Sequence, residues 1–495
     1  MIDCSKDARQ RICVEKWREA KGKGTLNLVM RFGKTRVAAL ILQEYLKKDP
    51  NRKIIALAPN VVTTQNLHKH LKEFVDPYKY WITIESTTAF KNILNKKRIE
   101  RKLPIKCDLL ILDEVHKMLS NETLNDISHI EYKHILCLTG ATLNKDQEKI
   151  LKSLNAPVID KIDEITAIAM KWIAPSIEYN LGIQLDDHDK VRYAKYTEQI
   201  VETLDLFKGL HNRMNTLFGQ TVFNSDFDLA LYSFTGLNYK DKNGRKTFIK
   251  PTIIRNALAD TMGWSKDMDL TNKYNQRINQ NWHPDNIFER VKKFKDYVRQ
   301  RNDILICNRP KINAVIEILK RNSVSTICFN ESIAMVDTLA DYFNKTSIPY
   351  HSSIESRYMI NPKTNDLFRY KNGEPKKIGQ ISLKKMAIEG MKDGTYKYLF
   401  TAQSLNEGLT IENVEQIITT GGSCNSNTYS QRIARGKTYN YLNPDKVCII
   451  INLFIDDFKI GEKEVKSRDK QKLIQRQSMS ENIPIWVNSI DEIFD

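Results

Sequence analysis

The sequence predicts an α/β protein made of two parallel-sheet units in tandem, with a mainly helical insertion between them. Residues 109–112 are four consecutive apolar residues, a pattern typical of a strand buried on both faces within a parallel sheet. Residues 26–30 form a similar strand candidate, and a helical stretch from Arg36 to Leu46 follows it. A second series of alternating strand and helix candidates begins near residue 301. Such alternation indicates parallel strands joined by right-handed crossovers.

The strand candidate 109–112 ends on two adjacent carboxylates, Asp113 and Glu114, and His116 follows them closely. Ligands bind at the carboxyl edge of such sheets. Adjacent carboxylates repel each other, and both ionise readily only near a cation or water. We therefore predict that Asp113 holds Mg²⁺ and that Glu114 orients and deprotonates a water. A buried strand that ends in a polar turn would give the same residues, and this short pattern alone does not separate the two interpretations.

The stretch after residues 26–30 contains Gly33, Lys34 and Thr35, and a helical segment follows. In this strand–loop–helix arrangement, backbone N–H groups at the helix start surround phosphates. Lys34 is predicted to reach the β- and γ-phosphate oxygens, and the Thr35 hydroxyl to bind Mg²⁺. Together with the two carboxylates downstream, the loop favours an ATPase.

The length and composition of the chain limit the number of domains, the class of partner and the cellular compartment. With 495 residues, the chain is too long for one ordinary core and indicates two or three domains. A formal charge of +17 makes a polyanion the natural partner, although a generally Lys-rich composition would give the same charge. The eight cysteines show no C-x-x-C pair, which argues against a zinc ribbon and for a reducing compartment. With neither a signal peptide nor an apolar run of membrane-spanning length, we expect a soluble cytoplasmic protein.

In order along the chain, these motifs resemble those of superfamily 2 helicases and translocases. Besides the phosphate loop and the carboxylate pair, the resemblance rests on Gln10, residues 139–142, residues 406–411 and residues 431–436. It implies two RecA-like domains that bind ATP with Mg²⁺ and act on nucleic acid. We expect the first RecA-like domain at 1–175, a linker with a basic, aromatic-rich insertion at 176–300, the second RecA-like domain at 301–458 and a C-terminal helical tail at 459–495.

The resemblance also implies roles for individual residues. Gln10 is expected to read the adenine, and the phosphates are expected to lie against Arg31, Phe32, Gly33, Lys34 and Thr35. Gln431 and the arginine finger Arg435 are expected to reach ATP from the second domain, where Gly408 and Arg432 complete the nucleotide site. Contacts to nucleic acid are expected from Pro59, Thr87, Thr88, Thr139, Thr142, His351, Ser352 and Thr401.

The sequence departs from the family pattern at four positions. Arg31 stands where the phosphate loop usually has glycine, so we expect an ordinary φ there. Leu143 replaces a proline, and Thr410 replaces an acidic residue. Thr438 stands where a second finger arginine is usual, which leaves Arg435 as the main finger and Arg432 to hold the motif together.

The insertion has a distinctive composition. From Gly236 to Gln300 there are 14 Lys or Arg residues against 7 Asp or Glu. Aromatic residues are interleaved with these charges: Trp264, Tyr274, Trp282, Phe288, Phe294 and Tyr297. Aromatic rings among basic residues suit single-stranded nucleic acid. A helical insertion whose aromatic residues form its own small core would give the same pattern.

Three functions agree with these observations. The first is an ATP-dependent helicase or branch-migrating translocase that acts on DNA. The second is a nucleic-acid-stimulated ATPase that remodels a transcription complex or another nucleoprotein complex without separating strands. An RNA helicase is the third. His116 leaves the RNA-specific Asp-Glu-Ala-Asp signature unmatched, which favours DNA.

Overall fold

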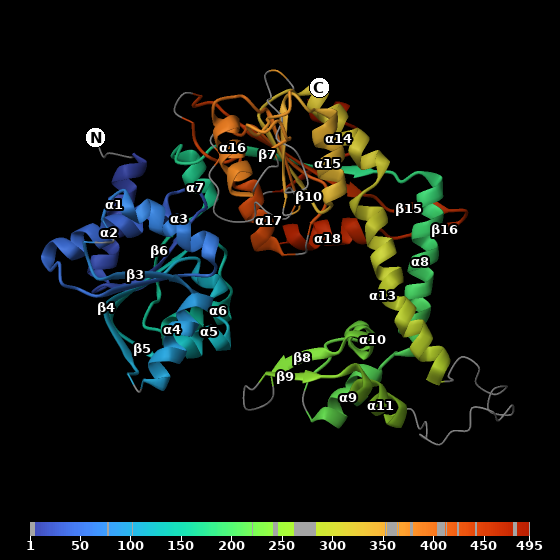
Figure 1. The fold of residues 1–495 in the computed structure, drawn as a ribbon, viewed down its shortest axis with the longest axis horizontal. Coiled ribbons are helices and arrows are strands. Elements are labelled where there is room, and N and C mark those ends of the chain that lie inside the picture. Colours follow the sequence, from blue (N-terminus) through green and yellow to red (C-terminus); the bar gives the residue numbers. More distant parts are fainter. Residues whose placement is uncertain are drawn as a thin grey trace. The chain divides into compact units, whose positions relative to one another are not determined.

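The computed structural model describes residues 5–76, 79–100, 102–219, 221–240, 246–261, 284–351, 353, 364, 366–376, 380–402, 411, 413–422, 425–440, 443–478 and 483–494. The chain forms two compact units. The first comprises Met1–Gly182, Lys311–Phe454 and Arg468–Asp495, and the second comprises Ile183–Pro310 and Ile455–Ser467. Two large sheets lie in the first unit, while the second is mainly helical (Figure 1). The predicted α/β class with two parallel sheets is confirmed. Within the described residues, no helix combines the length and the apolar character that a membrane span requires.

The first sheet has six strands in the order β3-β2-β4-β5-β1-β6, and all neighbours are parallel. The strands are β1 (Lys23–Leu28), β2 (Ile54–Ala58), β3 (Ile82–Ser86), β4 (Ile105–Leu112), β5 (Ile130–Thr139) and β6 (Val158–Ile162). The helices are α1 (Lys6–Glu19), α2 (Lys34–Lys48), α3 (Val61–Lys72), α4 (Thr87–Ile99), α5 (Asn121–Ile127), α6 (Lys145–Ser153) and α7 (Glu164–Ala169). One core packs the sheet against α1, α2 and α3, and another packs it against α4, α5 and α6.

The strand order positions the functional loops. β5 lies between β4 and β1, so the segments that follow these three strands emerge at the same carboxyl edge. These segments are the carboxylate pair, residues 139–142 and the phosphate loop. No strand was expected at β6, which lacks the long apolar run that marks β4. β1 also begins and ends earlier than the predicted 26–30, because Thr25–Leu28 are the residues buried between β5 and β6.

The second sheet has seven strands in the order β11-β12-β10-β13-β14-β7-β17. Its strands are β7 (Ser176–Ile183), β10 (Thr326–Asn330), β11 (Ser347–Tyr350), β12 (Tyr398–Ala402), β13 (Gln416–Thr419), β14 (Cys448–Ile455) and β17 (Ile485–Val487). The helices are α14 (Arg309–Arg321), α15 (Ile333–Tyr342), α16 (Gln380–Lys392), α17 (Ser426–Ile433), α18 (Arg468–Gln477) and α19 (Asp491–Phe494). Parallel pairing joins β11 to β12, β12 to β10, β10 to β13, β13 to β14 and β7 to β17. β7 comes from the range that the sequence assigned to the linker.

The helical unit is built around two long helices, α8 (Asp187–Leu206) and α13 (Pro284–Ile306), which pack against each other (Figure 1). It also contains α9 (Leu210–Phe218), α10 (Asp226–Thr235), α11 (Pro251–Thr261) and two antiparallel hairpins, β8 (Leu237–Lys240) with β9 (Lys246–Ile249), and β15 (Phe458–Ile460) with β16 (Lys463–Val465).

Two aromatic residues of this unit bear on the basic insertion. Phe294 is fully buried in the core of the unit, and Tyr297 packs against that core and stacks on Tyr196 at 6.2 Å between ring centroids. For Phe294 and Tyr297, the alternative of an internal core is therefore the better interpretation. Trp264, Tyr274, Trp282 and the side chain of Phe288 lie outside the described residues.

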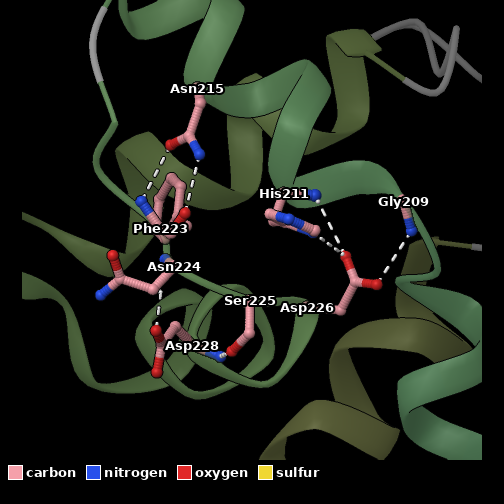
Figure 2. A network of polar contacts seen from close by, with 8 residues as sticks. All are labelled: Gly209, His211, Asn215, Phe223, Asn224, Ser225, Asp226 and Asp228. Carbon is pink, nitrogen blue, oxygen red and sulfur yellow. Dashed lines mark hydrogen bonds and ion pairs between the residues drawn. The ribbon is translucent and has the colours of Figure 1, made fainter.

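Polar contacts fasten the chain between α9 and α10 (Figure 2). Asp226 accepts hydrogen bonds from the backbone N–H of Gly209 (2.9 Å) and of His211 (3.2 Å), and its Oδ1 lies 2.7 Å from His211 Nδ1. Asn215 Oδ1 accepts the backbone N–H of Phe223 at 2.8 Å, and Asn215 Nδ2 donates to the Phe223 carbonyl at 2.7 Å. Side chains thus satisfy backbone groups that no helix or sheet pairs here.

The segment 459–495, predicted as a helical tail, has mixed structure. It includes the hairpin strand β16, the edge strand β17 and two helices, α18 and α19. Trp486, in β17, contacts Phe454 of β14 at 5.3 Å between ring centroids. Only α18 and α19 are helices among its described residues, whereas the apolar residues 485–487 form an edge strand of the second sheet.

Candidate nucleotide-binding and hydrolysis site

The phosphate loop joins β1 to α2. Gly33 has φ +100° and directly precedes α2, which no side chain among the described residues caps. The first amide groups of α2 are therefore open to an anion. A Cβ at position 33 would lie 2.5 Å from Gln10 Nε2. The left-handed backbone and this close approach both favour glycine.

Arg31 has φ +68°, so the expectation of an ordinary φ is wrong. The left-handed conformation costs a non-glycine residue about 1–2 kcal/mol. Contacts from α1 hold the loop in this conformation: Lys6 Nζ donates to the Arg31 carbonyl at 2.7 Å, and Gln10 Nε2 donates to the Phe32 carbonyl at 2.8 Å. The buried Phe32 ring packs edge-on against Trp172 at 5.3 Å between centroids.

Lys6 is a site residue that the sequence did not reveal. Its Nζ also donates to the Trp172 carbonyl at 3.0 Å, so one ammonium group ties α1, the phosphate loop and the segment after α7 together. Burial, together with the nearby charges of Arg31 and Arg36, lowers the pKa of Lys6 to about 8. The only available signal was its spacing, four residues and one helical turn before Gln10.

Gln10, which is expected to read the adenine, lies beside the phosphate loop. Its side chain is 2% exposed. While Nε2 holds the loop, Oε1 is buried without a hydrogen-bond partner among the described residues. A buried acceptor of this kind suits an amino group such as that of adenine.

The carboxylate pair follows β4. Lys34 Nζ lies 2.8 Å from Glu114 Oε1, which joins the phosphate loop to the pair. Burial and the adjacent charge of Glu114 raise the pKa of Asp113 to about 6. For Glu114, burial acts to raise the pKa, but the charges of Lys34 and His116 outweigh burial and the pKa is lowered. Glu114 also has φ +51°, so a second left-handed non-glycine residue lies at the same edge.

The residues present fit a magnesium ion. Asp113 and Thr35 offer a carboxylate and a hydroxyl oxygen, the hard ligands that Mg²⁺ prefers. The raised pKa of Asp113 shows that its charge lacks full compensation, which a divalent cation would supply. Glu114 Oε2 is also buried without a hydrogen-bond partner among the described residues.

Residues 139–142 connect the carboxylate pair to the phosphate loop. His116 Nδ1 lies 3.0 Å from Thr139 Oγ1 and 3.4 Å from Glu114 Oε2. Thr139 Oγ1 also accepts the backbone N–H of Ala141 at 3.1 Å. A Cβ on Gly140 would lie 2.6 Å from Lys34 Nζ and 3.0 Å from the Leu28 carbonyl, so glycine lets the two loops approach.

Comparisons with known proteins show what the chain is similar to. Residues 3–145 match the family model of the type III restriction enzyme res subunit, ResIII. The uncharacterized ATP-dependent helicase YqhH of Bacillus subtilis (strain 168) is 26% identical over 255 residues, which are 50% of this chain and 40% of that protein. The structure of S. cerevisiae Dbp5 bound to RNA and ADP BeF3 has a TM-score of 0.51 and 10% identity, over 98% of this chain and 91% of that chain. The chain is thus similar to the res-subunit family over residues 3–145, to an ATP-dependent helicase over half of its length, and to Dbp5 in its fold. The chain spans less than half the length of its curated relative.

The resemblance to superfamily 2 helicases predicted that three segments of the first sheet contact nucleic acid. Thr87, at the start of α4, donates from Oγ1 to the Pro59 carbonyl at 3.1 Å, so the structure brings these two residues together. Thr88 is exposed next to Thr87, and Thr142 is exposed after β5. Pro59, Thr87, Thr88 and Thr142 stay predicted nucleic-acid contacts.

Three other residues with the same predicted role are buried. Thr139 and Thr401 are fully buried, and His351 is 4% exposed with its Nε2 2.9 Å from Asp337 Oδ1. As a correction, none of the three offers a surface to nucleic acid in this structure. Thr139 and Thr401 are buried in strands β5 and β12, where apolar residues surround them. His351 contacts Asp337 on α15. Ser352 lies outside the described residues.

The predicted finger segment of the second sheet lies on and after α17. Arg435 is 6% exposed, and Gln431 is half-buried with its Oε1 3.5 Å from Lys117 Nζ. Arg31 Nε donates to the Ala434 carbonyl at 3.0 Å, which links the phosphate loop to the finger segment. Lys437 Nζ lies 2.5 Å from Glu164 Oε1. Gly408 and Thr410 lie outside the described residues.

Proposed function

We propose that this chain hydrolyses ATP and uses the energy to move along nucleic acid, with DNA as the substrate. The observation that carries the proposal is the Lys34–Glu114 ion pair, which joins the phosphate loop to the carboxylate pair at 2.8 Å. Phosphoryl transfer to water needs mainly positioning and charge neutralisation. Lys34 would neutralise phosphate charge, and Glu114 beside it would position the attacking water.

The ion pair also suggests how the site changes when ATP binds. The γ-phosphate would draw Lys34 Nζ away from Glu114, which then loses the strongest of the charges that lower its pKa. Glu114 would become a better proton acceptor at the moment a water must be deprotonated. Bound Mg²⁺ would neutralise phosphate charge, with Asp113 and Thr35 as its ligands.

Arg435 is the proposed arginine finger. Its guanidinium group, on the second sheet's segment, would stabilise charge that develops on the γ-phosphate. Lys437, the next candidate on the same segment, is already engaged with Glu164. Arg435→Ala should therefore keep ATP binding and lose most of the nucleic-acid-stimulated turnover. Arg435→Lys should restore little, because an ammonium group lacks the planar fork.

DNA is proposed over RNA because His116 departs from the Asp-Glu-Ala-Asp signature. The free cysteines among the described residues support a reducing compartment, and we propose the cytoplasm. Burial raises the pKa of the Cys137, Cys328 and Cys448 thiols to about 12, so these side chains behave as inert apolar groups.

The test measures ATP hydrolysis without polymer, with single-stranded DNA and with RNA, beside displacement of a strand from forked DNA. Lys34→Ala should abolish hydrolysis, and Lys48→Ala, an exposed lysine on the same helix, is the matched control. Stimulation by RNA alone would replace the DNA proposal with an RNA helicase. Stimulation by DNA without displacement or translocation would indicate a remodelling ATPase. An unchanged rate in Lys34→Ala would overturn the ATPase assignment.

A further inference from the structure

The second sheet buries an unusual number of polar side chains beside α17. Glu178 and Asn180 on β7, Thr419 on β13 and Asn452 on β14 are each at most 4% exposed. Polar groups in such an interior need hydrogen-bond partners, because an unpaired group costs roughly 1–3 kcal/mol. The partners come from two helices, α17 and α18, which pack against each other (Figure 1).

Glu178 is the centre of these contacts. Its Oε1 accepts hydrogen bonds from the Tyr429 hydroxyl on α17, from Asn452 Nδ2 at 3.0 Å and from Gln477 Nε2 on α18. Gln477 and Asn180 also exchange hydrogen bonds of 3.0 Å between their amide groups. Burial and the charge of Glu178 raise the pKa of Tyr429 well above its ordinary value, so the phenol remains a donor.

Arg476 joins α18 to α17 more directly. Its guanidinium carbon lies 5.0 Å from the Tyr429 ring centroid, and its Nη2 donates to Thr419 Oγ1 at 3.1 Å. A Cβ on Gly422 would lie 2.6 Å from Arg476 Nη1 and 3.3 Å from Arg432 Nη1. The absent side chain at Gly422 thus leaves room for one guanidinium group from each helix. Burial and the charge of Arg476 lower the pKa of Arg432 to about 10.

The other end of α18 is also fixed by a buried charge. Asp469, in the first turn, pairs with Lys311 of α14, whose Nζ lies 2.5 Å from Asp469 Oδ2 and donates to the Thr420 carbonyl at 2.7 Å. Lys311 is fully buried and Asp469 is 6% exposed. Both ends of α18 are therefore held at defined points of the second sheet.

We propose that α18 is a positioning element for the finger segment, with Arg476 as its principal positioning residue. Tyr429 and Arg432 form the face of α17 that α18 and the sheet hold, and Gln431 and Arg435 belong to the same segment. By fixing Tyr429, Arg476 keeps Gln431 and Arg435 where ATP hydrolysis needs them. This inference rests on the proposed function. The proposal assigns a role in ATP hydrolysis to α18, which lies in the range predicted as a C-terminal tail.

The test compares Arg476→Met with Arg468→Met, an exposed arginine on the same helix. Arg476→Met removes one hydrogen bond and one cation–π contact, so hydrogen exchange of the amides in 426–433 should rise about tenfold. Exchange in 34–48, on the first sheet, should not change. In the stimulated ATPase reaction, kcat should fall about tenfold while KM for ATP stays within about twofold, the pattern of a group that acts only in the transition state. Arg468→Met should match the wild type in every measurement.

Arg476→Lys keeps the positive charge, so it provides a second test if Arg476→Met does not fold. The lysine variant should keep the thermal unfolding midpoint yet recover only part of kcat, because an ammonium group cannot both stack and reach Thr419. Raised exchange with unchanged kcat would make Arg476 merely structural and overturn the proposal, as would unchanged exchange. A wild-type protein without ATPase activity would instead overturn the proposed function, while hydrogen exchange would still test the link between α18 and α17.

Discussion

The two sheets differ in the surroundings of their buried charged side chains. At the carboxyl edge of the first sheet, Asp113 and Glu114 place two carboxylates side by side, and Arg31 and Glu114 both have left-handed backbones. Beside the second sheet, Lys311 of α14 pairs with Asp469 of α18, and within the sheet Glu178 accepts hydrogen bonds from three donors. Strain and like charges persist where surrounding contacts impose them, and they concentrate at functional sites. We therefore expect the first region to bind a ligand and the second region to maintain the fold.

This contrast would be wrong if the buried pair of the second region contributed nothing to the free energy of unfolding. Lys311→Met leaves Asp469 buried without its cation, and breaking a buried pair typically costs about 3–5 kcal/mol. We expect a loss of this size in the free energy of unfolding, measured by urea denaturation. The double variant Lys311→Met/Asp469→Leu should recover much of it, because no charge remains buried. A loss below about 1 kcal/mol in the single variant would mean that the pair is not buried in solution.

In the first region, substitution should harm turnover without harming stability. Glu114→Gln preserves shape but cannot accept the proton of a water, so kcat should fall at least about 100-fold. ATP binding should persist, and the pKa of Asp113 should fall because its charged neighbour is gone. Paired measurements of kcat and of the thermal unfolding midpoint check this. Near-normal turnover would remove Glu114 from the general-base role.

The same contrast explains what the sequence could predict. Apolar runs correctly predicted the tandem sheets, and short motifs predicted a phosphate loop and a carboxylate pair, because those signals are local. β6 and β17 were missed because their burial depends on distant strands. Arg31 was assigned an ordinary φ because nothing nearby in sequence shows that Lys6 and Gln10 hold the loop. The partners of Glu178 come from residues 429, 452 and 477, so no spacing rule predicts them.

A smaller effect is expected at Lys6, which supports the strained loop from outside it. Lys6→Met removes the ammonium group that holds the Arg31 and Trp172 carbonyls, and loss of two charge-assisted hydrogen bonds should weaken ATP binding about tenfold. ATP affinity, measured with a fluorescent analogue, checks this, and Arg11→Met, at an exposed position on the same helix, is the control. An affinity within about twofold of the wild type would show that Gln10 alone holds the loop.

Lys6 should also make ATP binding depend on pH. Its pKa is lowered to about 8 by burial, by Arg31 and by Arg36, while Asp7 acts in the opposite direction. The ammonium form that grips the loop is present below that pH and is lost as the pH rises through about 8. Wild-type affinity should therefore fall over that range, and Lys6→Arg should abolish the dependence. The same pH profile in Lys6→Arg would assign the titration to another group.

The smallest effect is expected in the helical unit, where Asp226 holds the start of α9. Burial acts to raise the pKa of Asp226, but hydrogen bonds from Gly209 and His211 outweigh burial and lower it. A carboxyl with a lowered folded-state pKa stabilises the fold above its unfolded-state pKa and loses that contribution as the pH falls through the folded-state value. At neutral pH, Asp226→Asn should destabilise the unit by about 1 kcal/mol, the usual loss for a helix-capping carboxylate.

Hydrogen exchange of the amides in 210–218, corrected for the intrinsic pH dependence of exchange, measures this in the full chain. At neutral pH the asparagine variant should exchange faster than the wild type, by about fivefold for a loss of 1 kcal/mol. As the pH falls through the folded-state pKa of Asp226, the two proteins should converge, because the wild-type carboxylate becomes protonated. Asp205→Asn, an exposed carboxylate nearby, is the control and should follow the wild type throughout. A difference that persists undiminished in acid would mean that shape, and not the charge of Asp226, holds the start of α9.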